Sequence, residues 1–418
     1  MSQYNRKMKL LMTSDDPETI LSYGILSKMM IEDMHKKYDI HYLSLQRQIG
    51  APMVMRNDKG EVLYTSYSAH NEGQRNPTNM PNVIREVAPD MLWTNFDIQH
   101  YLNVKQYVPP GMPWIGWIPW DNHDPDQMPR AQEAFKNMTT RVAISKFGYD
   151  FLNHYGIEIE DYIYNIVDTN KYYPAKPDAE EMKIFKQKNA YWYKEDTKVL
   201  LFVGRPNWRK RILHMFAILK ELINRGWKNL RLLFHSSLDD PAKTANLREL
   251  IDALGLRDYI ITTPTAQFTW DRGISKDDLR VFYNAADIYI APHGGEGFGM
   301  PIAEAMACGT PFIASDTTTT KEFAGDNFER GLPCEIQYPL LANGQVLKDL
   351  GVNRPYPIVD KFADKIEQLL ADDSRRKRMG ENGVKWVNEN CSRRIVIDKW
   401  KKVFDSYNIP IGFTAGYK

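Results

Sequence analysis

The segment from His293 to Pro311, HGGEGFGMPIAEAMACGTP, limits what this chain can fold into more than any other part of the sequence. It follows an apolar stretch at Asp287–Ala291 that is typical of a buried strand. Pro301 suits the first helical position and Gly309 suits a helix exit, so we expect a helix between them. The glycines before Pro301 let the backbone approach a ligand closely, because no Cβ stands in the way. A glycine loop that runs into a helix N-terminus predicts an anion site.

Two glutamates belong to this predicted anion site. Glu296 lies in the glycine loop, and Glu304 falls in the second turn of the expected helix, eight positions later. A carboxylate beside an anion site is costly unless it binds hydroxyl groups. The ligand should therefore be both anionic and rich in hydroxyls, and a sugar joined to a nucleoside diphosphate has that chemistry.

Strand-like and helix-like segments alternate through both halves of the chain. In the first half, an apolar strand at 7–13 precedes a helix that Ser22-Tyr23-Gly24 leads into, and in the second half a new series begins with the strand at 198–203. This alternation predicts an α/β fold with parallel sheets. The polar segment at 56–81 breaks the rhythm, and we expect it to be an insertion or a mobile loop.

Three segments follow from this pattern. We expect an N-terminal Rossmann-like acceptor domain over 1–170 and a C-terminal Rossmann-like donor domain over 171–385. We expect residues 386–418 to form a C-terminal helix that packs back on the N-terminal domain.

Composition places the chain among soluble globular proteins of two or three domains. Of its 418 residues, 43% are hydrophobic and 26% are charged, and the formal net charge of +1 gives no overall attraction to nucleic acid or anionic membrane. Its cysteines, Cys308, Cys334 and Cys391, lack metal-ligand spacing and suit a reducing compartment. The N-terminus has no apolar signal region, and no apolar run reaches about eighteen residues. We therefore expect a cytoplasmic protein without a transmembrane segment.

A second cluster, VGRPNWRKR, carries positive charge to the end of a predicted strand. Arg205 ends the strand and Lys210 follows five residues later. In parallel α/β sheets, ligands bind outside the carboxyl ends of the strands, where a guanidinium and an ammonium can hold phosphate oxygens. The alternative is an ordinary basic loop in solvent.

The glycine-loop segment, with Gly-Phe-Gly, Pro, Glu-Ala and Gly-Thr-Pro in order, resembles the donor-site signature of the retaining glycosyltransferases of family 4, also called glycosyl transferases group 1. VGRPNWRKR is similar to the arginine and lysine that hold the donor diphosphate in that family. The resemblance covers most of the chain and is densest from Val199 to Gly325. It implies the GT-B fold, in which two Rossmann-like domains face each other across a cleft.

The resemblance also implies roles for individual residues. Glu296 would contact hydroxyls of the donor sugar, and backbone N–H groups from Gly297 to Met300 would touch the sugar or the diphosphate. Thr265 would lie near the base, and the Tyr23-Gly24 loop would approach the diphosphate from the opposite side. The residues expected to bind the donor are Glu304, Gly295, Gly297, Phe298, Gly299, Met300, Thr265, Tyr23 and Gly24.

The catalytic candidates include residues of the N-terminal half. Many family members have a histidine after the strand that here ends at Pro119, and this chain has Asp121 at the strand end and His123 two positions later. Either could meet the sugar or the acceptor hydroxyl, although a lone histidine in a loop is often structural. The expected catalytic residues are Glu296, Arg205, Lys210 and Asp121, with His123 as a further candidate.

The function implied is transfer of a sugar, with retention at the anomeric carbon, from a UDP- or GDP-sugar to an acceptor hydroxyl. Arg205, Lys210 and the helix that begins near Pro301 would stabilise the charge on the leaving phosphates. No Asp-x-Asp pair is placed against those phosphates, so we expect no metal and no other cofactor. The expected acceptor is a glycan or glycolipid. Replacing Glu296 with alanine should cut turnover severely without unfolding the protein.

Other functions stay open. Basic clusters such as RPNWRKR and DSRRKRM could contact DNA phosphates, so the acceptor could be a hydroxylated base in phage DNA, although the N-terminal half is slightly acidic. The chain could also bind nucleotide sugars without turnover, or act as an epimerase or phosphorylase. A basic amphipathic stretch at 385–404 allows peripheral binding to a membrane, but a closing helix packed on the body is favoured.

Overall fold

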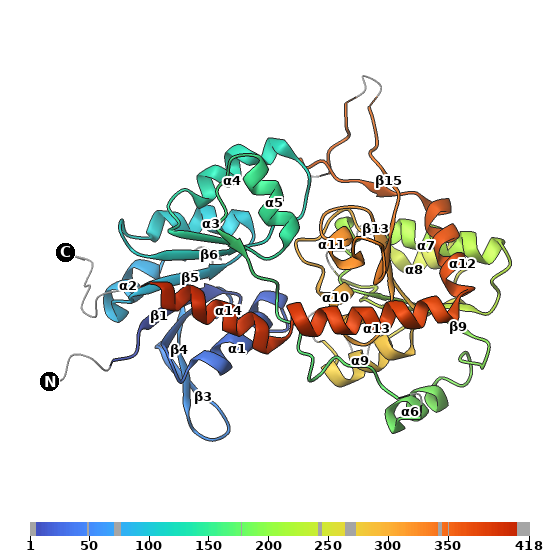
Figure 1. Ribbon diagram of the computed structural model, residues 1–418, viewed down its shortest axis with the longest axis horizontal. Coiled ribbons are helices and arrows are strands. Elements are labelled where there is room, and N and C mark those ends of the chain that lie inside the picture. Colours follow the sequence, from blue (N-terminus) through green and yellow to red (C-terminus); the bar gives the residue numbers. More distant parts are fainter. Residues whose placement is uncertain are drawn as a thin grey trace. The chain divides into compact units, whose positions relative to one another are not determined.

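The computed structural model describes residues 6–47, 50–70, 77–176, 178–240, 245–263, 273–341, 345–349 and 351–407. The chain forms two compact units, each with its own sheet (Figure 1). The first unit comprises Met1–Trp120, Pro125–Ile166 and Arg393–Lys418. The second comprises Asp121–Asp124 and Val167–Ser392, so a four-residue strip after Trp120 belongs to the second unit.

The first unit is built on a sheet whose strand order is β3-β4-β2-β1-β5-β6-β7-β8. All neighbours in it are parallel except β3 and β4, which are antiparallel. The strands are β1 (Lys9–Ser14), β2 (Asp39–Ser44), β3 (Met53–Arg56), β4 (Val62–Ser68), β5 (Met91–Asn95), β6 (Trp114–Ile118), β7 (Thr140–Ala143) and β8 (Asp161–Tyr162).

The expected insertion or loop at 56–81 is therefore wrong over Val62–Ser68, where the structure has strand β4. β4 lies inside it, pairs in parallel with β2, and buries Tyr64, Ser66 and Ser68. Its hydroxyl-bearing side chains made the segment look polar, but Ser68 Oγ donates to the carbonyl of Arg47 at 3.2 Å, so such groups are satisfied inside the fold.

Helices cover both faces of this sheet (Figure 1). They are α1 (Ser22–Met34), α2 (Met80–Val87), α3 (Ile98–Val104), η1 (Lys105–Tyr107), η2 (Pro125–Gln127), α4 (Met128–Phe135), α5 (Lys146–His154) and α14 (Arg393–Ser406). Trp400 of α14 is fully buried, with its ring 5.9 Å from Trp93 and 5.2 Å from Trp117 of the sheet. The C-terminal segment thus completes the core of the first unit.

The second unit has an all-parallel sheet with strand order β11-β10-β9-β12-β13-β14. Its strands are β9 (Lys198–Val203), β10 (Leu230–His235), β11 (Ile260–Thr262), β12 (Ile288–Ala291), β13 (Phe312–Ser315) and β14 (Gly331–Cys334), and a separate antiparallel pair is β15 (Ile336–Gln337) and β16 (Tyr356–Pro357). Strands buried on both faces read as continuous apolar runs, which is why KVLLFV and DIYIA were recognisable in the sequence.

The helices of the second unit are α6 (Glu180–Lys188), η3 (Trp208–Lys210), α7 (Ile212–Asn224), α8 (Leu247–Ala253), α9 (Lys276–Ala285), α10 (Met300–Ala307), α11 (Thr320–Ala324), α12 (Val359–Leu370) and α13 (Asp373–Asn390). The expected domain boundary after residue 385 falls inside α13, whereas the structure divides the chain after Ser392. The reason is packing beyond the expected boundary: the ring of Trp386 in α13 lies 5.3 Å from the ring of Phe323 in α11, which holds the end of α13 on the second unit.

The order of strands in the second unit also locates its crevice. From β9 the chain proceeds outward to β10 and β11 on one side, then returns to β12 and continues to β13 and β14 on the other. The loops after β9 and β12 therefore diverge at a topological switch point, where ligands of open α/β sheets bind. In the described ranges, no helix has both the length and the apolar character to cross a membrane.

Candidate functional site

The candidate site lies where β9, β12 and β13 end in the second unit. The loop after β9 carries Arg209 and Lys210, the loop after β12 carries Glu296, and the loop after β13 carries Thr318. The strip Asp121–Asp124 reaches the same place.

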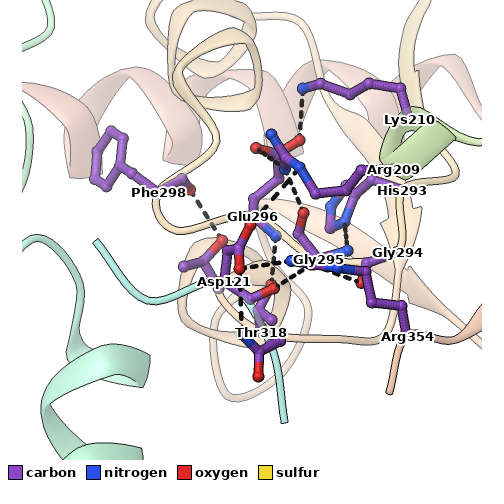
Figure 2. Close-up of polar contacts among 12 residues, drawn as sticks. Asp121, Arg209, Lys210, His293, Gly294, Gly295, Glu296, Phe298, Thr318 and Arg354 are labelled. Carbon is purple, nitrogen blue, oxygen red and sulfur yellow. Dashed lines mark hydrogen bonds and ion pairs between the residues drawn. The ribbon is translucent and has the colours of Figure 1, made fainter. Parts of the chain in front are cut away.

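Glu296 is the centre of the site (Figure 2). Lys210 Nζ lies 2.5 Å from Glu296 Oε1, and Arg209 Nη1 lies 2.8 Å from Oε2, so a separate cation holds each carboxylate oxygen. The side chains of Glu296, Lys210 and Arg209 are 10%, 13% and 22% exposed. The two predicted residues Lys210 and Glu296 are therefore brought into direct contact, and Arg209 joins them.

Burial and charge compete at this ion-pair cluster. Burial raises the pKa of Glu296, but the charges of Arg209 and Lys210 outweigh it, and the pKa is lowered overall. Burial lowers the pKa of Lys210, and the attraction of Glu296 offsets only part of that effect. Glu296 is therefore an anion at neutral pH, and the charge on Lys210 depends on an anionic neighbour.

Asp121 forms the second anionic point of the cluster. Arg354 Nη2 contacts Asp121 Oδ1 at 2.7 Å, Arg354 Nη1 donates to the Asp121 carbonyl at 2.7 Å, and Arg209 Nε lies 3.7 Å from Oδ2. Burial raises the pKa of Asp121, but Arg354 and Arg209 outweigh it and lower the pKa overall. Arg209, Lys210 and Arg354 thus face two carboxylates, which leaves one positive charge in the cluster.

The strip that carries Asp121 is fixed at its other end as well. Asp124 is fully buried, and its Oδ2 accepts from the backbone N–H of Asn353 at 2.9 Å. Arg354 also lies 5.2 Å from the Trp208 ring, in cation–π contact. The segment between β15 and β16 therefore holds the strip against the end of the sheet.

Two glycines of the loop are required by geometry. Gly295 has φ 137°, and a Cβ there would lie 2.1 Å from the Asp121 carbonyl oxygen. Gly299 has φ 95° and caps the N-terminus of α10, where no side chain makes a cap hydrogen bond. The start of α10 therefore has no side-chain cap, which is compatible with the predicted anion site but does not test it.

The other predicted loop residues differ in exposure. Gly297 and Met300 are partly exposed, whereas Phe298 is 3% exposed and its ring packs 5.2 Å from Phe323. The Phe298 carbonyl accepts from Thr319 Oγ1 at 2.9 Å. The Phe298 side chain is therefore part of the protein interior, and only its backbone is available for the predicted contact with a donor.

Two histidines of the site are neutral. The backbone N–H of Gly295 donates to His293 Nδ1 at 3.1 Å, and burial lowers the pKa of His293 to about 3. His293 lines a small cavity together with Lys210, Tyr289 and Glu296. The predicted residue His123 accepts from the backbone N–H of Thr318 at its Nε2, at 3.1 Å, and burial lowers its pKa. Neither ring is protonated at neutral pH.

Glu304 occupies a different environment from Glu296. Tyr283 donates its hydroxyl to Glu304 Oε2 at 2.7 Å, and burial raises the pKa of Glu304 to about 7. The structure therefore shifts the pKa values of the two predicted glutamates in opposite directions, because cations outweigh burial at Glu296, whereas burial outweighs the hydrogen bonds from tyrosines at Glu304.

Arg205, which was predicted to hold phosphate oxygens together with Lys210, contacts a different residue in the structure. Arg205 forms a two-point ion pair with Asp240, with Nε–Oδ2 2.8 Å and Nη2–Oδ1 2.9 Å, and Asp240 is 1% exposed. Arg209 is the arginine that contacts Glu296, so the sequence located the cationic loop but not the arginine nearest the carboxylate.

Tyr23 and Gly24 belong to the first unit. Tyr23 donates its hydroxyl to Asp97 Oδ1 at 2.8 Å, and a Cβ on Gly24 would lie 2.2 Å from the Asp16 carbonyl oxygen. Packing of the preceding turn on α1 therefore explains that glycine without a ligand. Thr265 lies outside the described residues. Among the residues that are described, no group of three or more His, Cys, Asp or Glu side chains is arranged to hold a metal ion.

Residues 183–337 match the family model of glycosyl transferases group 1. That range contains Arg205, Lys210, Glu296 and Glu304. The chain is 27% identical over 218 residues to the capsular polysaccharide biosynthesis glycosyltransferase CapM of Staphylococcus aureus. The matched region covers 51% of this chain and 46% of CapM. The chain thus spans about half the length of this curated relative.

Solved structures resemble the whole chain. Sucrose-phosphate synthase of Thermosynechococcus elongatus superposes with a TM-score of 0.72 at 15% identity, over 96% of this chain and 99% of that one. The Anabaena protein HepE, in complex with UDP and glucose, superposes with a TM-score of 0.68 at 14% identity, over 96% of this chain and 100% of that one. Together with the two parallel Rossmann-like sheets, these likenesses confirm the predicted GT-B fold class.

Proposed function

We propose that this protein is a glycosyltransferase that moves a sugar from a UDP- or GDP-sugar to the hydroxyl of a glycan or glycolipid, with retention of anomeric configuration. The observation that carries the proposal is the buried Glu296 carboxylate, held by Lys210 and Arg209 beside the N-terminus of α10. The match of residues 183–337 to glycosyl transferases group 1 supports it.

The site has the two recognition elements that such a donor needs. Lys210, Arg209 and the uncapped start of α10 would receive the diphosphate, with Arg205 as a further cation at the end of β9. Glu296, once it shares its cations with the phosphates, would accept hydrogen bonds from hydroxyls of the sugar. Glu304 would accept from the ribose hydroxyls.

The proposed reaction breaks one bond and forms one. The bond between the anomeric carbon and the phosphate oxygen breaks, and its electron pair leaves with the nucleoside diphosphate. The acceptor oxygen bonds to the same face of that carbon, and its proton passes to the departing phosphate oxygen. Lys210 and Arg209 stabilise the negative charge that develops there, so cationic side chains do the work that a metal ion does in other transferases.

The acceptor class rests on the relatives. CapM is named for capsular polysaccharide biosynthesis, which supports a glycan, and the HepE complex with UDP and glucose supports a uridine donor. The candidate residue Asp121 and its neighbour His123 would stand near the sugar or the acceptor hydroxyl.

The proposal is tested with a panel of UDP- and GDP-sugars. We expect slow release of nucleoside diphosphate without acceptor, faster release with glycans or glycolipids, and unchanged rates in EDTA. NMR of the product should show the anomeric configuration of the donor. A protein that neither binds nucleoside diphosphates nor hydrolyses any nucleotide sugar overturns the proposal. A product with the opposite anomeric configuration overturns the retaining mechanism. Loss of activity in EDTA overturns metal independence. Transfer only to DNA that contains hydroxymethylated bases overturns the proposed glycan or glycolipid acceptor.

A further inference from the structure

Thr318 has a backbone conformation that threonine seldom adopts. Its φ is 49°, in the left-handed region, although it is β-branched and only 7% exposed. A branched Cβ clashes with its own backbone there, so such a residue persists only where surrounding contacts hold it. Strained positions of this kind concentrate at functional sites, which makes the neighbours of Thr318 informative.

Those neighbours belong to the candidate site (Figure 2). Thr318 Oγ1 accepts from the backbone N–H of Glu296 at 2.9 Å, and the Thr318 N–H donates to His123 Nε2 at 3.1 Å. The next residue, Thr319, donates its hydroxyl to the carbonyl of Phe298 at 2.9 Å. Both ends of the turn from Glu296 to Phe298 are therefore tied to the loop after β13.

The other described non-glycine residues with positive φ help to interpret this contact. They are Ala88, Arg211 and Phe328. Ala88 is the C-cap of α2, a position where left-handed residues are common. Arg211, with φ 55°, directly follows Lys210, the cation bonded to Glu296. Two of the four described non-glycine residues with positive φ are therefore next to the ion pair between Lys210 and Glu296: Thr318 is hydrogen-bonded to Glu296, and Arg211 follows Lys210 in the chain.

We propose that Thr318 is a positioning residue, strained so that its hydroxyl fixes the backbone of Glu296 and holds that carboxylate in place for the transferred sugar. The proposal rests on the function proposed above. A glycine would meet the backbone requirement without strain but offers no hydroxyl, so threonine is used here for its side chain. No motif in the sequence pointed to this residue.

Three substitutions separate the hydroxyl from the strain. Thr318→Ser keeps the hydroxyl, Thr318→Ala removes it and keeps a Cβ in the left-handed conformation, and Thr318→Gly removes both. We expect the kcat of nucleotide-sugar hydrolysis to fall about tenfold in the alanine and glycine variants, with little change in KM, and serine to restore it. We expect the glycine variant to melt at a higher temperature than the alanine variant.

Phe328→Gly is the matched control. Phe328 has φ 54° in the same unit, is 42% exposed, and its backbone N–H bonds only locally, to the carbonyl of Gly325. Replacing it should change the melting temperature but not kcat. If kcat follows melting temperature across all four variants, or if the alanine variant turns over like the wild type, Thr318 is an ordinary structural residue and the proposal is overturned.

Amide hydrogen exchange keeps this test independent of the proposed function. The N–H of Glu296 should exchange faster in the alanine and glycine variants of Thr318 and at the wild-type rate in the serine variant. Unchanged exchange in the alanine variant overturns the positioning role even if the protein is an active transferase. Wild-type protein without activity, but with the expected exchange pattern, instead contradicts the proposed function alone.

Discussion

Replacing Glu296 with glutamine should separate the structural and chemical roles of the ion-pair cluster. Glutamine has nearly the same shape and keeps one oxygen as an acceptor, but it removes the negative charge that Lys210 and Arg209 share. Breaking a buried ion pair by removing one partner costs about 3–5 kcal/mol. Because glutamine retains an acceptor and Arg209 is 22% exposed, we expect the lower end, about 3 kcal/mol. Domains of ordinary stability, about 5–15 kcal/mol, remain folded after such a loss.

Acidic pH should reduce this difference in stability. The pKa of Glu296 is lowered in the folded protein, so its contribution to stability is present above the pKa of the unfolded chain and is lost as pH falls. The wild type should therefore approach the variant in stability at acidic pH and exceed it most at neutral pH. Turnover should fall about 100- to 1000-fold at neutral pH, since a charged group at the reacting centre is lost.

Urea unfolding and nucleotide-sugar hydrolysis measure the two effects separately. Glu221→Gln is the matched control, because Glu221 pairs with Arg225 on the surface of α7 and such pairs contribute about 0–1 kcal/mol. Pyrophosphate should stabilise Glu296→Gln more than the wild type, because the added anion takes the place of the lost carboxylate. A variant that unfolds and turns over like the wild type would refute both the buried ion pair and its part in transfer.

Two further predictions concern groups near the cluster. Burial raises the pKa of Glu304 to about 7 in the folded protein, from 4.5 in the unfolded chain. This shift corresponds to about 3 kcal/mol of folding stability. That stability should be fully present below about pH 4.5 and should be lost as the pH rises through 7. Urea midpoints of Glu304→Gln, which stays neutral, should vary less over that range, and a profile like that of the wild type contradicts the shift. Arg209→Ala should weaken UDP binding, measured by calorimetry, more than Arg205→Ala does. The main effect of Arg205→Ala should be lower stability, because the buried carboxylate of Asp240 loses its ion-pair partner. Weaker UDP binding in Arg205→Ala than in Arg209→Ala would contradict the placement of these arginines.

The sequence predicted the sheet strands where their residues are uniformly apolar. β9 and β12 were found because strands covered on both faces need apolar side chains at every position. β4 was missed because its sequence, VLYTSYS, carries hydroxyl groups. Whether those hydroxyl groups can be buried depends on hydrogen bonds to other segments of the chain. Composition alone cannot separate a polar loop from a buried strand whose hydroxyls are hydrogen-bonded.

Contacts within the site were predictable only where sheet topology decides them. Lys210 and Glu296 follow neighbouring strands of a parallel sheet, so their loops had to meet at its carboxyl edge. Which arginine joins them depends on the turn at Arg211 and on Asp240, which holds Arg205. Such local geometry and long-range pairing leave no pattern in the sequence.

Arg354 shows the limit most clearly. It lies 233 residues from Asp121 in the chain, follows no recognisable motif, and yet contacts both the side chain and the backbone carbonyl of that aspartate. The glycine at 295 was visible in the sequence. The reason for it was not, because the carbonyl oxygen of Asp121, which would lie 2.1 Å from a Cβ at this position, belongs to the same distant strip.

The charges of the cluster give the proposed donor a physical basis. A partly buried group of cations is unfavourable unless anions neutralise it, and here Glu296 and Asp121 neutralise all but one positive charge. The cluster is therefore nearly neutral without a ligand, and its remaining positive charge attracts an anion. A diphosphate carries more negative charge than the single unneutralised positive charge of the cluster can balance. Its binding must therefore draw Lys210 and Arg209 partly away from Glu296. That shift would free carboxylate lone pairs for sugar hydroxyls at the moment the diphosphate arrives. We therefore expect the site to bind a free sugar more weakly than a nucleotide sugar.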